Sequence, residues 1–107
     1  MGIADLVKKL RLEVLSGNDL SADIDGVYIG DLLSHVMSKA QQGNIWLTVQ
    51  TNVNIVAVAS LCDVACIILP EGIKPDSAAL QKAEAEEIII LSYTGTAFEF
   101  ITEYNKP

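Results

Sequence analysis

The chain has little positive charge and few residues of the kinds that carry chemistry. Its 107 residues include 7 Lys and Arg against 14 Asp and Glu, one histidine and two cysteines, so the formal charge is −7. Proteins that bind nucleic acid neutralise phosphates with basic side chains. Here Arg11 is the single arginine and no basic cluster is present, which argues against a nucleic-acid partner. Two cysteines, Cys62 and Cys66, do not make a disulfide framework.

The sequence also lacks a membrane-spanning or signal segment. The most apolar stretch, 53–69, contains Asn54, Ser60 and Asp63. An Asp near the centre of a bilayer costs about 2.5–3.5 kcal/mol, so a buried helix followed by a buried strand explains this stretch better. In residues 1–14 the charges follow the apolar residues, and no small-residue cleavage site is present. We therefore expect a cytoplasmic protein with no membrane partner.

Motifs of the common enzyme classes are absent as well. There is no P-loop, no dinucleotide-binding glycine motif, no zinc-protease helix motif and no nucleophile elbow. His35 follows Asp31 by one helical turn, which favours a contact between them, but no nucleophile accompanies the pair. Cys62 and Cys66 fit buried apolar positions better than metal ligation, with a metal site shared between two subunits as the alternative. We predict no enzymatic activity, no cofactor and no metal site.

Apolar residues, in contrast, are abundant. Half of the residues are hydrophobic, 20% are charged and the mean hydropathy is +0.36, a composition that excludes disorder. The length predicts one domain over residues 1–107. A domain of this size leaves about a third of its unfolded-chain surface exposed, so it cannot hide all of its apolar residues. We therefore predict a homodimer; the alternative is that strands buried on both faces absorb the apolar excess.

The apolar residues of the first part of the chain follow the spacing of short elements. They predict a helix over 1–10, strands over 12–15 and 24–29, and a bulge or close backbone approach at Gly26. Asp31 is expected to cap the next helix. The buried face of that helix is expected to contain Leu32, Leu33, Val36, Met37 and Ala40.

The second part of the chain alternates strands and helices regularly. Apolar strands are predicted over 45–49, 64–69 and 88–91, with helices between them and a last helix that ends near Asn105. Strands that are apolar throughout form parallel sheets with helices on both faces. The predicted fold class is α/β, a small three-layer sandwich with a mostly parallel sheet of about five strands. The direction of the two N-terminal strands is left open, so a mixed sheet is the alternative.

Two polar loops mark the place where a ligand is expected. In open α/β sheets, ligands bind beyond the carboxyl ends of the strands, where the next helices begin. The loops after 45–49 and 88–91 supply amides, hydroxyls and a glycine, which suit a neutral polar group, or a phosphate held by backbone N–H groups. The alternative is that they are ordinary caps and turns. The candidate ligand-binding residues are Gln50, Thr51, Asn52, Asn54, Thr94, Gly95 and Thr96.

Four segments between Gly26 and Phe98 carry a resemblance to a known family. They are VYIGDLLSHVMSKAQQGNIWLT, QTNVNIVAVASLCDVACIIL, PEGIKPDSAALQKAEAEE and IIILSYTGTAFE. In this order they resemble the DRTGG domain, a small α/β module. The literal string that gives the family its name is absent, and Gln50–Asn54 occupies the equivalent strand-to-helix junction.

The resemblance implies a regulatory role. Related domains are regulatory or spacer modules in bacterial phosphate acetyltransferases and in pyrophosphatases that also carry CBS domains, and the fold is similar to the N-terminal domain of the HPr kinase family. Stand-alone versions are often encoded beside iron-only hydrogenase components in anaerobic bacteria. The implied function is a non-catalytic regulatory or sensory module that binds a small metabolite or nucleotide and acts as a homodimer or on a partner enzyme. The alternative is a purely structural protein–protein interaction module with no small ligand.

Overall fold

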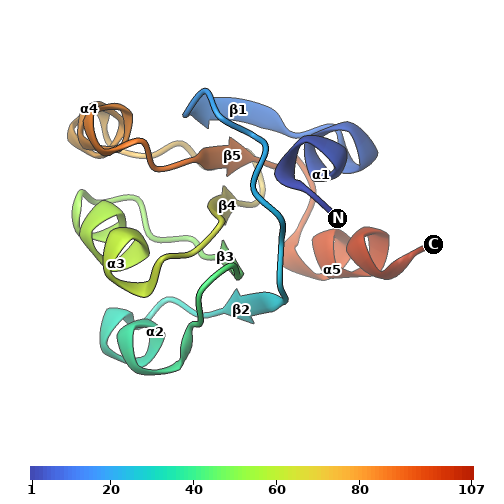
Figure 1. Cartoon of the computed structure of the whole chain (residues 1–107), viewed down its shortest axis with the longest axis horizontal. Coiled ribbons are helices and arrows are strands. Elements are labelled where there is room, and N and C mark those ends of the chain that lie inside the picture. Colours follow the sequence, from blue (N-terminus) through green and yellow to red (C-terminus); the bar gives the residue numbers. More distant parts are fainter.

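Ten elements follow one another along the chain, and their strands join into one five-stranded sheet (Figure 1). The computed structural model describes residues 1–107. The helices are α1 (Ile3–Leu10), α2 (Leu33–Lys39), α3 (Asn54–Cys62), α4 (Ser77–Glu86) and α5 (Ala97–Asn105). The strands are β1 (Glu13–Ser16), β2 (Val27–Ile29), β3 (Ile45–Leu47), β4 (Cys66–Leu69) and β5 (Ile90–Ser92). None of the helices combines the length and the apolar character required to cross a membrane.

The sheet is mixed, with one antiparallel edge. Its strand order is β1-β5-β4-β3-β2, and the four strands β5, β4, β3 and β2 are parallel to one another. β1 pairs antiparallel with β5, so the two N-terminal strands, whose direction the sequence left open, behave differently from each other. The prediction of an α/β fold with a mostly parallel sheet of about five strands is confirmed.

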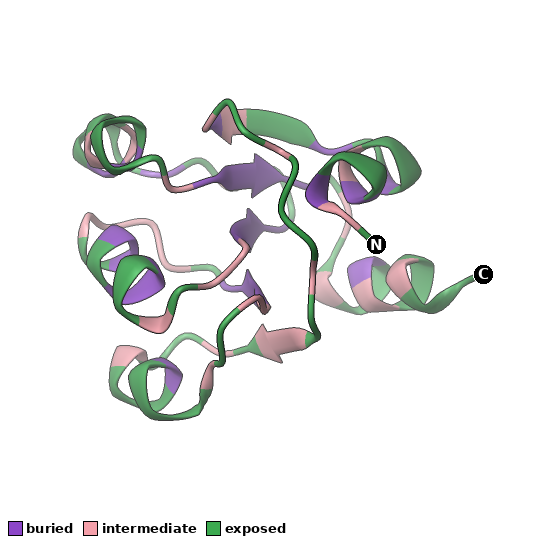
Figure 2. Cartoon of the chain, in the orientation of Figure 1, coloured by how far each residue is buried: buried purple, intermediate pink, exposed green.

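Helices cover both faces of the sheet and make three layers. α2, α3 and α4 pack on one face, and α1 and α5 pack on the other (Figure 1). Side chains alternate between the faces along each strand, so Ile67 lies in the core beneath α3 and α4, whereas Ile68 lies in the core beneath α1 and α5. The three central strands are buried throughout, while the edge strands β1 and β2 are partly exposed (Figure 2).

β2 is shorter than the predicted strand 24–29. Its first residue is Val27, because the preceding residues make a different contact: the N–H of Asp25 donates to the carbonyl oxygen of Gly43 at 2.8 Å. Gly26 has a φ of +80°, and a Cβ at this position would lie 3.2 Å from Nδ2 of Asn44. The neighbour is thus a side chain and no other backbone comes close, so the bulge or close backbone approach expected at Gly26 is not what the glycine serves; its positive φ is.

α2 differs most from its prediction. Only Val36 is fully buried, whereas Leu32 and Met37, expected on the buried face, are 60% and 49% exposed. The reason is the position of α2 over the short edge strand β2, with a neighbouring helix, α3, on one side only. The prediction that Asp31 caps this helix is also wrong: the N-cap residue is Leu32, and no side chain caps the helix.

Candidate functional site

The two predicted loops lie at the carboxyl edge of the sheet, but the structure does not bring them into contact with each other. β4 and the loop after it stand between them. The N–H of Asp76 donates to the carbonyl oxygen of Thr51 at 2.9 Å, and the N–H of Glu71 donates to the carbonyl oxygen of Gly95 at 2.8 Å. Each predicted loop is thus joined to the loop after β4, and the seven candidate residues form two separate groups.

In the first group, Gln50–Asn54, the side chains of Gln50 and Asn52 are used internally. Nε2 of Gln50 donates to the carbonyl oxygen of Asp31 at 2.8 Å, and Nδ2 of Asn52 donates to Oε1 of Gln50 at 3.0 Å. Oδ1 of Asn52 accepts from the N–H of Asn54 at 2.9 Å, at the start of α3. This series of amide contacts fixes the loop, while the Thr51 hydroxyl and the Asn54 side-chain amide have no hydrogen-bond partner in the chain.

Asp31 anchors this first group from the neighbouring loop. Its Oδ1 accepts from Oγ1 of Thr48 at 2.7 Å and from the N–H of Val49 at 2.9 Å. The carboxylate therefore ties the loop after β2 to the end of β3, which explains why it does not cap α2. It makes no hydrogen bond with His35, which is exposed, so the contact expected between these two residues is absent.

The second group, Thr94–Thr96, lies between β5 and the start of α5. Thr96 caps that helix: its Oγ1 accepts from the N–H of Glu99 at 3.1 Å, and Oε1 of Glu99 accepts from the N–H of Thr96 at 2.9 Å. The hydrogen bond from the Thr96 backbone, followed by that from its side chain, lowers the pKa of Glu99. Gly95 lies against Tyr93, because a Cβ there would be only 2.8 Å from Cε2 of the ring. Thr96 and Gly95 therefore have structural roles.

Thr94 is the exception in the second group. Its hydroxyl is exposed and has no hydrogen-bond partner in the chain. It lines a cleft of about 370 Å³ between the end of α1 and the end of β5. The lining residues are Lys9, Leu10, Arg11, Tyr93, Thr94 and Glu103.

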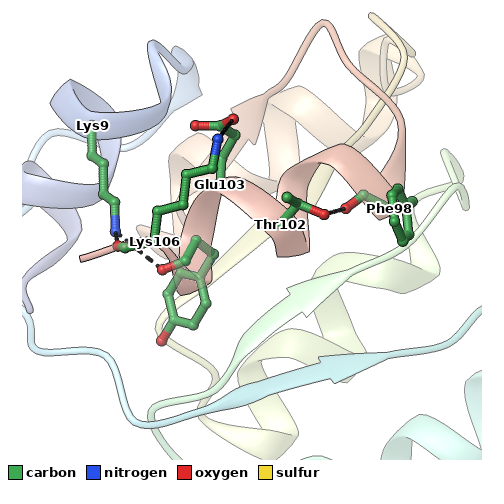
Figure 3. Close-up of polar contacts among 6 residues, drawn as sticks. Lys9, Phe98, Thr102, Glu103 and Lys106 are labelled. Carbon is green, nitrogen blue, oxygen red and sulfur yellow. Dashed lines mark hydrogen bonds and ion pairs between the residues drawn. The ribbon is translucent and has the colours of Figure 1, made fainter.

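Lys9 and Arg11 are lining residues that sequence reasoning missed. Nζ of Lys9 donates to the carbonyl oxygen of Tyr104 at 3.1 Å and to that of Lys106, so it holds the end of α5 (Figure 3). Nζ of Lys106 lies 3.0 Å from Oε1 of Glu103. The packing of α1 against α5 places Lys9 of α1 against Lys106, the residue that follows α5. The close spacing of Lys8, Lys9 and Arg11 was the available signal.

A larger cavity, of about 450 Å³, lies at the opposite edge of the sheet. Its lining includes Gly43, Ala65 and Ile89, which precede β3, β4 and β5. Its carboxylates are Asp19, Asp23, Asp63, Glu84 and Glu87. These acidic side chains form no group of three or more placed to hold a metal ion. The cavity faces away from the predicted loops and is unsuited to an anionic ligand, because like charges repel.

The two cysteines lie on opposite faces of the sheet. Cys66 is in the core beneath α1 and α5, and burial raises the pKa of its thiol to about 12. Cys62 packs against the other core, with its Sγ 3.7 Å from the carbonyl oxygen of Val36, and desolvation raises its pKa too. The side chains do not converge, and both thiols are protonated at neutral pH, as expected for cysteines in apolar positions.

Comparisons with known proteins agree with this architecture. A family model described as DRTGG domain matches residues 5–106. The chain is similar to a crystal structure of the CBS and DRTGG domains of the regulatory region of Clostridium perfringens pyrophosphatase, complexed with the activator diadenosine tetraphosphate. The TM-score is 0.72 with 14% identity, and the match covers 94% of this chain and 44% of that chain, so this chain spans less than half of its length. No curated protein matches.

Proposed function

The chain belongs to the DRTGG domain family, and from this premise we propose that it is a regulatory module that binds a small ligand and catalyses no reaction. The ligand class we propose is a nucleotide, and the target is a partner enzyme, in a hydrogenase-associated context. The regulatory region of the similar pyrophosphatase, which binds a nucleotide activator, supports the ligand class.

The proposed binding site is the carboxyl edge of the sheet, over the loops Gln50–Asn54 and Thr94–Thr96. The observation that carries this proposal is the cleft beside Thr94, where a free hydroxyl adjoins two cationic side chains. A ligand held there would contact the ends of both α1 and α5, which are packed together. Binding could therefore be transmitted to a protein partner through the surface of these helices.

Exposed apolar side chains favour a second candidate function, a module that binds only protein. Phe98 on α5 is 80% exposed and Leu61 on α3 is 69% exposed, although both are large apolar residues. Such residues frequently mark a contact with another molecule. Under this reading the chain is a homodimer or binds an enzyme subunit, with no small ligand.

A thermal-shift titration separates the two functions. ATP, ADP, AMP and adenosine are titrated against the purified chain, with sedimentation measured in parallel. A ligand present at 100 times its Kd stabilises by about 2.7 kcal/mol, which corresponds to a rise in Tm of about 10 °C or more for a domain of this size. If no compound raises Tm and the protein sediments as a dimer that Phe98→Asp converts to a monomer, the protein-only function replaces the proposed one.

A further inference from the structure

Positive charge is concentrated at one place on an acidic molecule. Four of the seven Lys and Arg residues lie on or next to α1 and α5: Lys8, Lys9, Arg11 and Lys106. α1 packs against α5, so the four lie on one side of the sheet. The same helices carry the carboxylates of Asp5, Glu99 and Glu103, so the attraction of this surface for an anion depends on which cations have no carboxylate partner.

Lys9 and Arg11 contribute charges that no carboxylate neutralises. Lys9 donates only to the carbonyl oxygens of Tyr104 and Lys106, and the guanidinium of Arg11 makes neither a hydrogen bond nor an ion pair. The backbone of Arg11 is nevertheless fixed: its φ is +55°, and its N–H donates to the carbonyl oxygen of Val7 to end α1. The negative end of the helix dipole, about half an elementary charge, favours these cations but does not cancel them.

The rest of the cleft adds hydrogen-bond donors. The hydroxyls of Tyr93 and Thr94 have no partner in the chain, and both residues line the cleft. Burial, followed by the charges of Glu99 and Glu103, raises the pKa of Tyr93, so its hydroxyl remains a donor at neutral pH. Glu103, the one carboxylate in the lining, is paired with Lys106 at 3.0 Å (Figure 3). The polar groups without partners in this cleft are thus mostly donors.

We propose that the cleft formed by Lys9, Arg11, Tyr93 and Thr94 binds the phosphate group of a small anionic ligand. The inference rests on the proposed function and adds which residues bind the phosphate of the nucleotide. A planar guanidinium binds phosphate through two parallel hydrogen bonds, and Lys9 supplies a second positive charge. The volume of about 370 Å³ is at the small end of ligand sites, which fits one phosphorylated group better than a dinucleotide.

The other parts of the molecule do not offer these conditions. The cavity at the amino edge is lined by five carboxylates and no cation. At the start of α3, the N–H groups of Asn54, Ile55 and Val56 are already bonded within the loop. Among these three places, only the α1–β5 cleft combines free hydroxyls with cations that have no carboxylate partner.

Calorimetric titration of the full chain with pyrophosphate, ADP and adenosine tests the inference. Arg11→Gln removes the guanidinium, Arg11→Lys keeps the charge without the planar group, and Lys8→Gln makes the same charge change on α1 outside the cleft. We expect Arg11→Gln to weaken binding of pyrophosphate and ADP about tenfold, the loss of one charge-assisted hydrogen bond. Lys8→Gln should change affinity less than twofold, and Arg11→Lys should fall between. Thermal melts check that the variants fold.

The outcomes separate this inference from the proposed function. If ADP and adenosine bind equally well and Arg11→Gln has no effect, the nucleotide function stands and the phosphate site is overturned. If pyrophosphate binding depends on Arg11 but ADP binds no more tightly than pyrophosphate, the phosphate site stands and the nucleotide function is overturned. Equal losses in Arg11→Gln and Lys8→Gln overturn the site in favour of diffuse attraction. Absence of all binding overturns both proposals.

Discussion

The two polar loops at the carboxyl edge of the sheet look alike in sequence and differ in structure. In the loop after β3, Gln50 and Asn52 are bonded to each other, to the carbonyl oxygen of Asp31 in the loop after β2, and to the start of α3. In the loop after β5, Thr96 is used as a helix cap while Thr94 stays free beside a basic cleft. Both loops are polar and uncharged, but the groups available to a ligand depend on which polar groups are already hydrogen-bonded. The first loop keeps only Thr51 and Asn54 free, whereas the second places the free hydroxyl of Thr94 beside Lys9 and Arg11 and is the better part of the candidate site.

Removal of the Asp31 carboxylate should produce the largest change in stability. Asp31→Ala breaks the hydrogen bonds from Thr48 and Val49, and Thr48 is buried. We expect a loss of about 2 kcal/mol, because hydrogen bonds to a charged group are stronger than neutral ones. Urea unfolding measures this loss. Asp76→Ala is the matched control, since the Asp76 side chain makes no capping bond, and it should stay within about 0.5 kcal/mol. Equal effects would show that Asp31 has no special structural role.

Gly95→Ala should have the next largest effect. The new Cβ would meet the ring of Tyr93 at 2.8 Å, and this ring packs edge-on against Phe100 with centroids 5.4 Å apart. Forcing extra volume into a packed site costs about 1–3 kcal/mol. Gly30→Ala makes the same contact with Tyr28, at 2.9 Å, but Tyr28 is only partly buried and its ring can move. Chemical unfolding should therefore show a larger loss for Gly95→Ala; an equal or reversed order would contradict this explanation.

The two threonines of the second loop provide a smaller and sharper contrast. Thr96→Ala removes the hydroxyl that caps α5, and the loss of such a cap costs about 1 kcal/mol. Thr94→Ala removes a hydroxyl without a partner and should leave stability unchanged within about 0.5 kcal/mol. Denaturant midpoints of the two variants, measured under the same conditions, test this difference in stability. A larger loss for Thr94→Ala would mean that its hydroxyl has a structural role.

The smallest expected effect is a pH dependence from Glu99. Its pKa is lowered in the folded chain by the hydrogen bonds from Thr96, so the carboxylate stabilises the fold above its unfolded pKa of about 4.3. That stabilisation is lost as pH falls through the lower folded pKa. The difference in Tm between the chain and Glu99→Gln should therefore shrink between about pH 5 and pH 3. A difference that stays constant with pH would exclude this contribution.

The fold was largely predictable because the strongest signals were local. The apolar runs at 45–49, 64–69 and 88–91 predict buried parallel strands without knowledge of their neighbours, and the structure has all three. The sequence predictions are wrong where the contacts of a residue depend on a distant part of the chain. Asp31 would suit a helix cap, but Thr48 and the backbone of Val49 compete for its carboxylate. Met37 has the spacing of a buried residue, but no element covers its side of α2.

The sequence predicts at which edge of the sheet the candidate loops lie, but not which other residues lie beside them. The sequence puts loops at the carboxyl edge, and that holds for both groups. Lys9 and Arg11 could not be assigned to the same edge, because their position depends on the antiparallel pairing of β1 with β5. The sequence left the direction of that strand open. The Thr96–Glu99 capping box has a recognisable spacing, but the contacts of the first loop with Asp31 join residues 19 positions apart and have no such signature.

The pairing of β1 with β5 has a consequence for how the molecule is made. The first strand hydrogen-bonds to the last one, and Lys9 near the start of the chain holds carbonyl groups near its end. During synthesis, residues 1–16 are made before β5 and gain these neighbours only after β5 has emerged from the ribosome. Contacts so distant in sequence slow folding and make it depend on a complete chain. We expect a nascent chain that stops before β5 to remain open and sensitive to proteases, and to close when the last strand and helix emerge.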